Sequence, residues 1–147
     1  MASILKDIPI DAHPDDVWDA VRDFGALHTR LVPGFVLDTQ LEGDARIVTF
    51  ASGTVAREPL VDCDDARRRL AYALVGERVK HYGASVQVFA DGEDRARVVW
   101  IVDVLPNEIA PYIDGQMDQG VRAMQKALGR VSPTNVIFLT EGVPDPA

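Results

Sequence analysis

Between Phe35 and Leu105 the sequence consists of short runs of branched and aromatic residues, separated at even spacing by tight-turn signals. The turn signals are Gly43-Asp44, Ser52-Gly53, the acidic stretch from Asp62 to Asp65, Gly76-Glu77 and Asp91-Gly92. Short strands joined by tight turns are typical of an antiparallel meander. The pattern predicts six strands, at 35–41, 45–51, 55–61, 69–75, 82–89 and 96–105.

The chain before this meander combines one strand with two short helices. Isoleucines alternate along residues 4–10 and predict a first strand, in which Pro9 suits a sheet edge. Pro14 and the two aspartates after it favour a helix N-terminus, because carboxylates are stabilised at the positive end of the helix dipole. Gly25 is expected to end this helix in a left-handed conformation, and a second helical turn is expected before Pro33.

After Pro106 the apolar spacing becomes helical. One face of a helix from Ile109 to Leu128 carries Ile113, Met117, Val121, Met124 and Leu128, and Gly129 is expected to cap it. Only this helix is long enough to cover the apolar face of the sheet. The predicted fold is therefore α+β, with a seven-stranded antiparallel sheet curled around a long C-terminal helix. We expect one domain over residues 1–130 and a C-terminal tail over 131–147.

Length and composition fit one acidic domain. With 147 residues, 47% of them apolar, the chain can bury a sizeable core without a second domain. Lys and Arg number 15 against 23 Asp and Glu, which gives a net charge of -8. Such a surface repels phosphate backbones and anionic headgroups, so neither nucleic acid nor a membrane surface is an expected partner.

We expect no cofactor, metal site or targeting segment. The single cysteine, Cys63, cannot form an intramolecular disulfide, and its acidic neighbours disfavour the thiolate. His13, His28 and His81 lie far apart, without metal-ligand spacing. The N-terminus lacks a basic region followed by a long apolar run, and no apolar stretch is long enough to span a bilayer. These features predict a cytoplasmic protein without membrane insertion.

Alternation along the later strands predicts an apolar inner face. If Tyr82 points inward, Ala84, Val86 and Val88 do so too. The same reasoning gives the inner face of the neighbouring strands, namely Leu70, Tyr72, Leu74, Val98, Trp100, Val102 and Val104. A tyrosine among small and branched residues indicates either a core with one polar group or the wall of a hollow. A surface of mainly hydrocarbon and aromatic groups favours a pocket for an apolar small molecule.

Several segments carry a resemblance to a known superfamily. They are PIDAHPDDVWDAVRDFGAL, EPLVDCDDARRRLAYALVGE, HYGASVQV and RVVWIVDVLP, in the order strand, two short helices, six strands and long helix. The chain resembles the START-like, or Bet v 1-like, helix-grip superfamily, and most of all its bacterial polyketide cyclase/dehydrase and lipid-transport (SRPBCC) group. It is also similar, more distantly, to the plant abscisic acid receptors. This fold hosts carriers, sensors and enzymes.

The resemblance implies a deep apolar cavity between the sheet and the C-terminal helix, with an entrance framed by loops between neighbouring strands. A ligand-facing glutamate and tyrosine of the receptors correspond to Glu58 and Tyr82, and a phenylalanine corresponds to Tyr72. The receptors' cavity lysine falls near Thr29 or Arg30, their gate SGLPA is reduced to ASGTVA, and their latch HRL becomes RVK. These departures argue against hormone sensing.

Glu58 is the leading candidate for chemistry. Apolar walls would raise its pKa and allow it to move protons or bind a ligand hydroxyl, whereas the alternative is an ion pair with Arg57 or another arginine near the rim. Tyr82 is the second catalytic candidate, as a donor to a carbonyl, although Tyr72 and Tyr82 can also be packed core residues. The expected ligand contacts are Arg30, Glu58, Leu60, Tyr72, Leu74, Tyr82, Ala84, Val98, Trp100, Tyr112, Gln116 and Gln119.

Two features of the long helix bear on this pocket. Gln116 and Gln119 would supply polar contacts, unless they belong to a solvated helix face. Gly115, Gly120 and Ala123 are small and would keep the helix thin beside a cavity; glycine inside a helix costs about 1 kcal/mol relative to alanine, so a packing reason is expected.

Three functions are compatible with the sequence. The first is binding of a hydrophobic small molecule of polyketide, terpenoid or lipid type. The second is a cyclase, dehydratase or isomerase in which Glu58 moves protons and a tyrosine polarises a carbonyl. The third is an interaction module, in which Val136 to Leu139 add a strand to a sheet edge within the protomer or across a homodimer.

Overall fold

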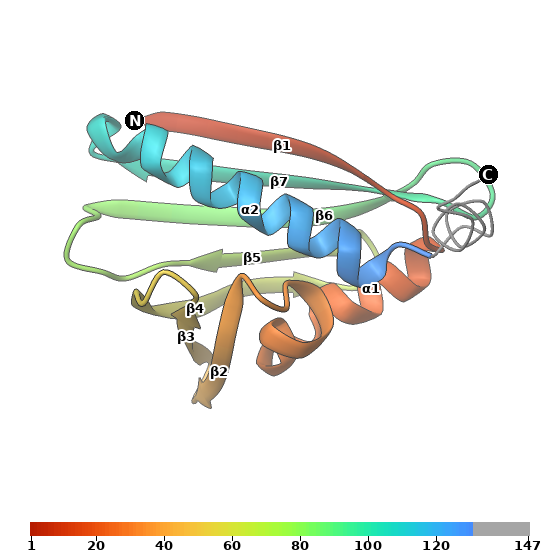
Figure 1. Cartoon of the computed structure of the whole chain (residues 1–147), viewed down its shortest axis with the longest axis horizontal. Coiled ribbons are helices and arrows are strands. Elements are labelled where there is room, and N and C mark those ends of the chain that lie inside the picture. Colours follow the sequence, from red (N-terminus) through yellow and green to blue (C-terminus); the bar gives the residue numbers. More distant parts are fainter. Residues whose placement is uncertain (131–147) are drawn as a thin grey trace, which may run out of the picture.

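One antiparallel sheet of seven strands forms the body of the protein (Figure 1). The computed structural model describes residues 1–130, so the expected tail with its apolar run Val136 to Leu139 lies outside the described residues. The strands are β1 (Ala2–Ile10), β2 (Val36–Glu42), β3 (Ala45–Phe50), β4 (Val55–Asp64), β5 (Arg69–Ala73), β6 (His81–Ala90) and β7 (Ala96–Leu105). Their order, β1-β7-β6-β5-β4-β3-β2, confirms the predicted sheet.

Six of the strands follow one another as hairpins, as the meander pattern predicts, and only β1 departs from chain order. It pairs along β7 from Ala2 opposite Val104 to Ile10 opposite Ala96. Gly53, in the β3–β4 turn, has a φ of 93°, a conformation that glycine adopts without the steric penalty of a side chain. The position of this turn sets the β3–β4 register, and the register decides which side chains of the two strands lie opposite each other.

The β4–β5 turn differs from the expectation. The acidic stretch 62–65 is predicted to be a turn, but β4 continues to Asp64, which pairs with Arg69 of β5. The turn instead includes Arg68, which has a φ of 51°. Pairing with β5 satisfies the backbone of this stretch, and that gain outweighs the turn preference of its aspartates.

Three short helical segments join β1 to β2. They are α1 (Pro14–Arg22), the 3-10 helix η1 (Phe24–Ala26) and the π-helix η2 (Leu27–Leu31). Pro14 opens α1 as expected, and the Nδ1 atom of His13 caps it by accepting a hydrogen bond from the Asp15 backbone N–H at 3.1 Å. The expected left-handed helix end at Gly25 is wrong, because α1 ends three residues earlier and Gly25 lies inside η1 without a positive φ.

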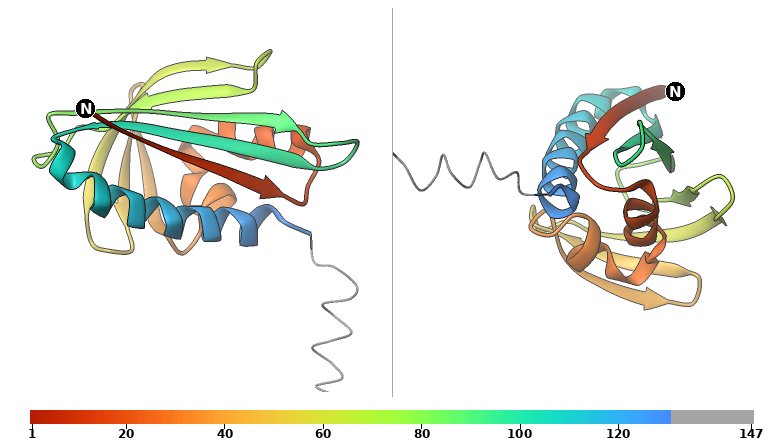
Figure 2. Two further views of the ribbon diagram at one scale, coloured as in Figure 1. Left: turned by 90° about the horizontal axis from the view of Figure 1, so that it is seen from above. Right: turned by 90° about the vertical axis from the view of Figure 1, so that its right-hand side faces the viewer.

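The long helix α2 (Ala110–Leu128) crosses the concave side of the sheet after a 3-10 turn, η3 (Asn107–Ile109) (Figures 1 and 2). Its contacts with the sheet lie mainly along the edge strand β1. There Lys6 donates hydrogen bonds to Asp114 and, at 2.8 Å, to Asp118, one helical turn further on. The helix is therefore anchored along one edge of the sheet.

Gly129 follows α2, as expected, but not in the left-handed conformation of a glycine cap. Its φ is -70° and its backbone is extended, while its N–H still bonds to the carbonyl of Gln125 at 3.0 Å. In the part of the chain that the structure describes, neither α2 nor any other helix combines the length and the apolar character needed to cross a bilayer.

Candidate ligand cavity

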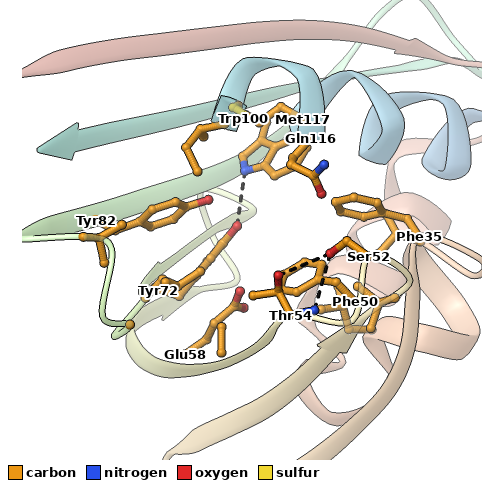
Figure 3. Close-up of a pocket in the computed structure, with 18 of the residues that line it drawn as sticks. Phe35, Phe50, Ser52, Thr54, Glu58, Tyr72, Tyr82, Trp100, Gln116 and Met117 are labelled. Atoms are coloured by element: carbon orange, nitrogen blue, oxygen red, sulfur yellow. Dashed lines mark hydrogen bonds between the residues drawn. The ribbon is translucent and has the colours of Figure 1, made fainter. Parts of the chain in front are cut away.

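A cavity of about 720 Å³ lies between the concave face of the sheet and α2. Its wall is mainly apolar and includes Phe35, Phe50, Trp100 and Met117 (Figure 3). The exposed residues of the lining come from the β3–β4 turn, the β5–β6 connection and the segment that leads into α2. The cavity therefore opens between these three segments.

Glu58 is the most buried acid in the wall. It is 3% exposed and lies directly opposite Arg46 of β3 in the hairpin register. Its Oε1 atom accepts a hydrogen bond from Arg46 Nε at 2.8 Å. Burial raises the pKa of Glu58, and the charge and hydrogen bond of Arg46 only partly offset this effect. The other carboxylate oxygen accepts no hydrogen bond from a described residue and remains accessible from the cavity.

Several neighbours hold the Arg46 guanidinium in place beside Glu58. The guanidinium lies 4.1 Å from the ring centroid of Phe24 and 5.0 Å from that of Tyr72, and its Nη1 donates to the Phe24 carbonyl at 3.3 Å. A guanidinium over an aromatic face is stabilised by the ring quadrupole, most strongly where water is excluded. The buried cation thus has an anion, a carbonyl and two rings around it. The alternative of an ion pair between Glu58 and an arginine is therefore present, with Arg46 rather than Arg57 as the partner. Arg57 instead pairs with Glu42 at 3.2 Å on the surface.

Tyr72 and Tyr82 bring hydroxyl groups into the same cavity from β5 and β6 (Figure 3). Tyr72 Oη accepts a hydrogen bond from the indole Nε1 of Trp100 at 3.2 Å. The Tyr82 hydroxyl has no hydrogen-bond partner among the described residues and is accessible from the cavity. Burial raises the pKa of both tyrosines well above its ordinary value, so both remain protonated at neutral pH.

Gly120 lets α2 pass directly over Trp100. A Cβ atom at Gly120 would lie 2.9 Å from Cζ3 and 3.0 Å from Cη2 of the indole, closer than such atoms normally approach. A Cβ atom at Gly115, on the same helix, would lie in open space. The expected packing role of the helix glycines therefore applies to Gly120 and not to Gly115.

Seven of the twelve expected ligand contacts lie on the cavity wall. They are Glu58, Tyr72, Leu74, Tyr82, Trp100, Tyr112 and Gln116. Arg30 does not, because its guanidinium pairs with Asp19 at 2.6 Å and Asp23 at 2.9 Å on the surface. Gln119 is exposed on the solvent side of α2, which is the alternative that its sequence position left open.

Three further expected contacts also lie outside the wall. Val98 is fully buried, between Ile8 and Val88 at the end of the sheet away from the cavity mouth. Ala84 is buried opposite Val102, and its short side chain does not reach the cavity. Leu60 is half-buried beside the irregularity where β4 shifts its pairing with β5.

Arg46 is a charged residue of the cavity wall that sequence reasoning missed, although a signal for it exists. With the turn at Ser52-Gly53, counting back along β3 and forward along β4 places Arg46 opposite Glu58. Opposite charges at directly facing positions of an antiparallel pair interact. Phe35, Phe50 and Met117 also line the cavity, but residue type alone does not separate them from ordinary core.

Within residues 1–130 no three histidine, cysteine or acidic side chains come together as a metal ion would need.

Sequence comparison gives the family. Residues 1–130 match the family described as polyketide cyclase / dehydrase and lipid transport. The chain belongs to this family. No curated protein matches it in sequence.

Solved structures with the same fold come from bacteria and plants. The protein XoxI from Bacillus cereus is 23% identical, with a TM-score of 0.76 over 87% of this chain and 96% of that one. A Thermobifida fusca protein is 26% identical, with a TM-score of 0.69 over 86% and 89%. Norcoclaurine synthase from Thalictrum flavum, in its truncated form, is 20% identical, with a TM-score of 0.68 over 89% and 95%. These bacterial and plant proteins share a Bet v 1-like fold with this chain.

Proposed function

We propose that the protein binds a hydrophobic small molecule of polyketide, terpenoid or lipid type in the cavity between the sheet and α2. The observation that carries this proposal is the cavity itself. Its volume of about 720 Å³ is in the range of small-molecule sites, and its apolar wall with a few polar groups is the composition that such sites have. An apolar ligand that leaves water for this wall gains roughly 25 cal/mol for each Å² that it buries.

The comparisons support a ligand of this class. The family description names lipid transport together with polyketide cyclase and dehydrase activity, and lipids are hydrophobic molecules. Norcoclaurine synthase from Thalictrum flavum, which shares the fold, has been solved in complex with dopamine and hydroxybenzaldehyde. At least one other protein of this fold therefore binds small aromatic molecules.

A fluorescence titration tests the proposal. N-phenylnaphthylamine, an uncharged dye that brightens in apolar surroundings, should bind at one saturable site. Ala56→Phe places a ring on the cavity wall and should weaken binding at least tenfold. Val61→Phe is the matched control, because Val61 lies on the same strand, is 67% exposed and is not part of the wall. Equal binding by both variants would place the dye elsewhere and contradict the proposal.

A second candidate function is proton transfer to or from the ligand by Glu58, with a tyrosine hydroxyl polarising a carbonyl. The observation that favours it is the free carboxylate oxygen of Glu58, which lies in the same buried wall as Tyr72 and Tyr82. A buried carboxyl with a raised pKa exchanges protons closer to neutral pH than an exposed one. Such a group is suited to cyclisation, dehydration or isomerisation.

Glu58→Gln separates the two candidates. The compound that co-purifies with the protein is first identified by native mass spectrometry and then offered to both proteins. A catalyst should lose most of its turnover and keep its affinity, because the amide retains the shape but cannot accept a proton. A carrier should show a change in affinity alone, with no product from either protein.

A further inference from the structure

The hydrogen bond between Trp100 and Tyr72 fixes the direction in which Tyr72 can donate. An indole Nε1–H is a donor only, so the Tyr72 oxygen must be the acceptor in this 3.2 Å contact. The Tyr72 proton must then point elsewhere, and no described residue accepts it. Tyr72 is only 6% exposed and lines the cavity, because protein encloses the rest of its ring. The cavity is therefore the direction left for the hydroxyl donor.

Tyr82 adds a second donor beside the first. Its hydroxyl also lacks a partner among residues 1–130. Figure 3 shows the two hydroxyl groups pointing toward the same part of the cavity, below the indole of Trp100. Tyr82 lies two residues from Ala84, the register partner of Tyr72, so the two tyrosines are diagonal neighbours on one face of the sheet. Two convergent donors form a receptor for one acceptor oxygen.

The charges of the wall argue against an anionic acceptor. The charged residues in the lining are Arg46, Glu58, Glu77, Arg78 and Glu108, which are two cations and three anions. The buried cation among them, Arg46, is already paired with Glu58 at 2.8 Å. A carboxylate ligand would add a second anion beside this pair and would leave water for a wall with no net positive charge, which is unfavourable.

We propose that the cavity holds an uncharged ligand by a carbonyl oxygen, which accepts hydrogen bonds from the hydroxyls of Tyr72 and Tyr82, and that Trp100 positions the first of these donors. The inference rests on the proposed function and narrows its ligand class to neutral ketones and related carbonyl compounds. Tyr72 and Tyr82 contact the ligand directly, whereas Trp100 acts through Tyr72 and is a positioning residue.

Three naphthalenes of nearly equal shape test this selectivity by isothermal titration. Acetylnaphthalene carries a neutral carbonyl, ethylnaphthalene has no oxygen, and naphthoate carries a carboxylate. The ketone should bind roughly five- to tenfold more tightly than the hydrocarbon, since each net hydrogen bond to a neutral group is worth about 1 kcal/mol and part of this is lost in desolvating the carbonyl. Naphthoate should bind more weakly than either.

Variants assign the effect to the named residues. In Tyr72→Phe/Tyr82→Phe the ketone should lose its advantage over ethylnaphthalene, while ethylnaphthalene binding, which checks that the cavity is intact, should change less than twofold. The carbonyl stretching frequency of the bound ketone should be lowered in the wild-type protein and restored in the double variant. Trp100→Phe should raise this frequency part of the way, because it keeps an aromatic ring but removes the N–H that orients Tyr72.

The outcomes separate this inference from the proposed function. Equal affinity for ketone and hydrocarbon, or tighter binding of naphthoate, would overturn the inference alone. A lowered carbonyl frequency that persists in the double variant would also overturn it, because the donors would then be other groups. Failure of all three probes to bind would overturn the proposed function and the inference with it. If the double variant does not fold, Tyr82→Phe alone should reduce the ketone's advantage about threefold.

Discussion

The two halves of the sheet meet α2 in different ways. On the β1 and β7 side, Ile8 and Val102 are fully buried and lie outside the cavity wall, so the space beneath the helix is filled by protein. On the β4 and β5 side, Glu58 and Tyr72 are almost as deeply buried, yet their polar ends face a hollow. Burial from solvent is therefore similar on both sides, whereas packing against neighbouring side chains is not.

This difference shows what anchoring along one edge does. Lys6 ties α2 to β1 through Asp114 and Asp118, and the long strand β7 continues the sheet under the helix. The curvature of the sheet then carries β3, β4 and β5 away from the helix, so a single helix cannot fill the space on that side. The hollow is a consequence of sheet curvature and helix position, and Arg46, Glu58 and Tyr72 reach it from β3, β4 and β5.

The largest expected effect comes from breaking the buried ion pair on the hollow side. Arg46→Met should destabilise the protein by about 3 to 5 kcal/mol, because it leaves the Glu58 carboxyl buried without its cation. Urea-induced unfolding measures this change. Arg57→Met is the matched control, since Arg57 also pairs with a glutamate, lies on the adjacent strand and is exposed.

For the control we expect little change in the midpoint of unfolding, because exposed ion pairs contribute little. The double variant Arg46→Met/Glu58→Gln should recover part of the lost stability, since no uncompensated charge remains. Similar losses for Arg46→Met and Arg57→Met would mean that the inner pair is as hydrated as the outer one, which contradicts the burial described above.

The two glycines of α2 give the next effect. Gly120→Ala should destabilise the protein by about 2 kcal/mol, because the new methyl group meets the rigid indole of Trp100. Gly115→Ala should stabilise it by roughly 0.5 to 1 kcal/mol, because Gly115 is exposed, has free space and gains helix propensity. Thermal unfolding of the two variants checks both signs. Stabilisation by both substitutions would show that α2 does not lie tightly on Trp100.

Alkaline pH should reveal the buried tyrosines. Their pKa values are raised in the folded protein, whereas in the unfolded chain they release protons near pH ~10. The folded state therefore binds more protons above this pH, so the free energy of unfolding should fall as pH rises. Tyr72→Phe should make that fall shallower by about 1.4 kcal/mol per pH unit. An unchanged slope would mean that Tyr72 titrates normally in the folded state.

Much of this fold is predictable because period and turn chemistry act locally. The last strand, β7, has the bounds that alternation predicts, and Tyr82, Trp100 and Val102 lie on the inner face as expected. The β4–β5 turn is not predicted correctly, since long-range pairing extends β4 through aspartates that favour turns. Gly25 is likewise misplaced, because a glycine can occupy a 3-10 turn as easily as a helix end.

The candidate site is only partly predictable, for a different reason. Alternation tells which side chains point inward, but not whether they meet protein or empty space. Val98 and Tyr82 share an inner face by parity, yet only Tyr82 lines the cavity. Arg30 illustrates a second limit, because Asp19 on α1 and Asp23 directly after it compete for its charge and hold it on the surface. The pairing of Arg46 with Glu58 follows from the hairpin register and can be predicted from the sequence.

A small difference between two valine substitutions sharpens the comparison itself. Val102→Ala, on the filled side, should cost about 2 kcal/mol, because surrounding side chains cannot close the space that it leaves. Val86→Ala, on the cavity wall, should cost about 1 kcal/mol, because the removed methyl groups already face a void on one side. Urea-induced unfolding of the pair measures the difference. A larger loss for Val86→Ala would indicate that the hollow is filled by side chains in solution.

Methyl NMR during a titration with ethylnaphthalene tests the central claim most directly. The account predicts saturable shifts of the Val86, Met117 and Met124 methyl signals, which lie on the cavity wall, and much smaller shifts for Val102 and Val104, which are equally buried but lie outside it. Shifts that spread equally over both sets, or that leave the first set unmoved while exposed methyl groups respond, would contradict a ligand-accessible hollow between the sheet and α2.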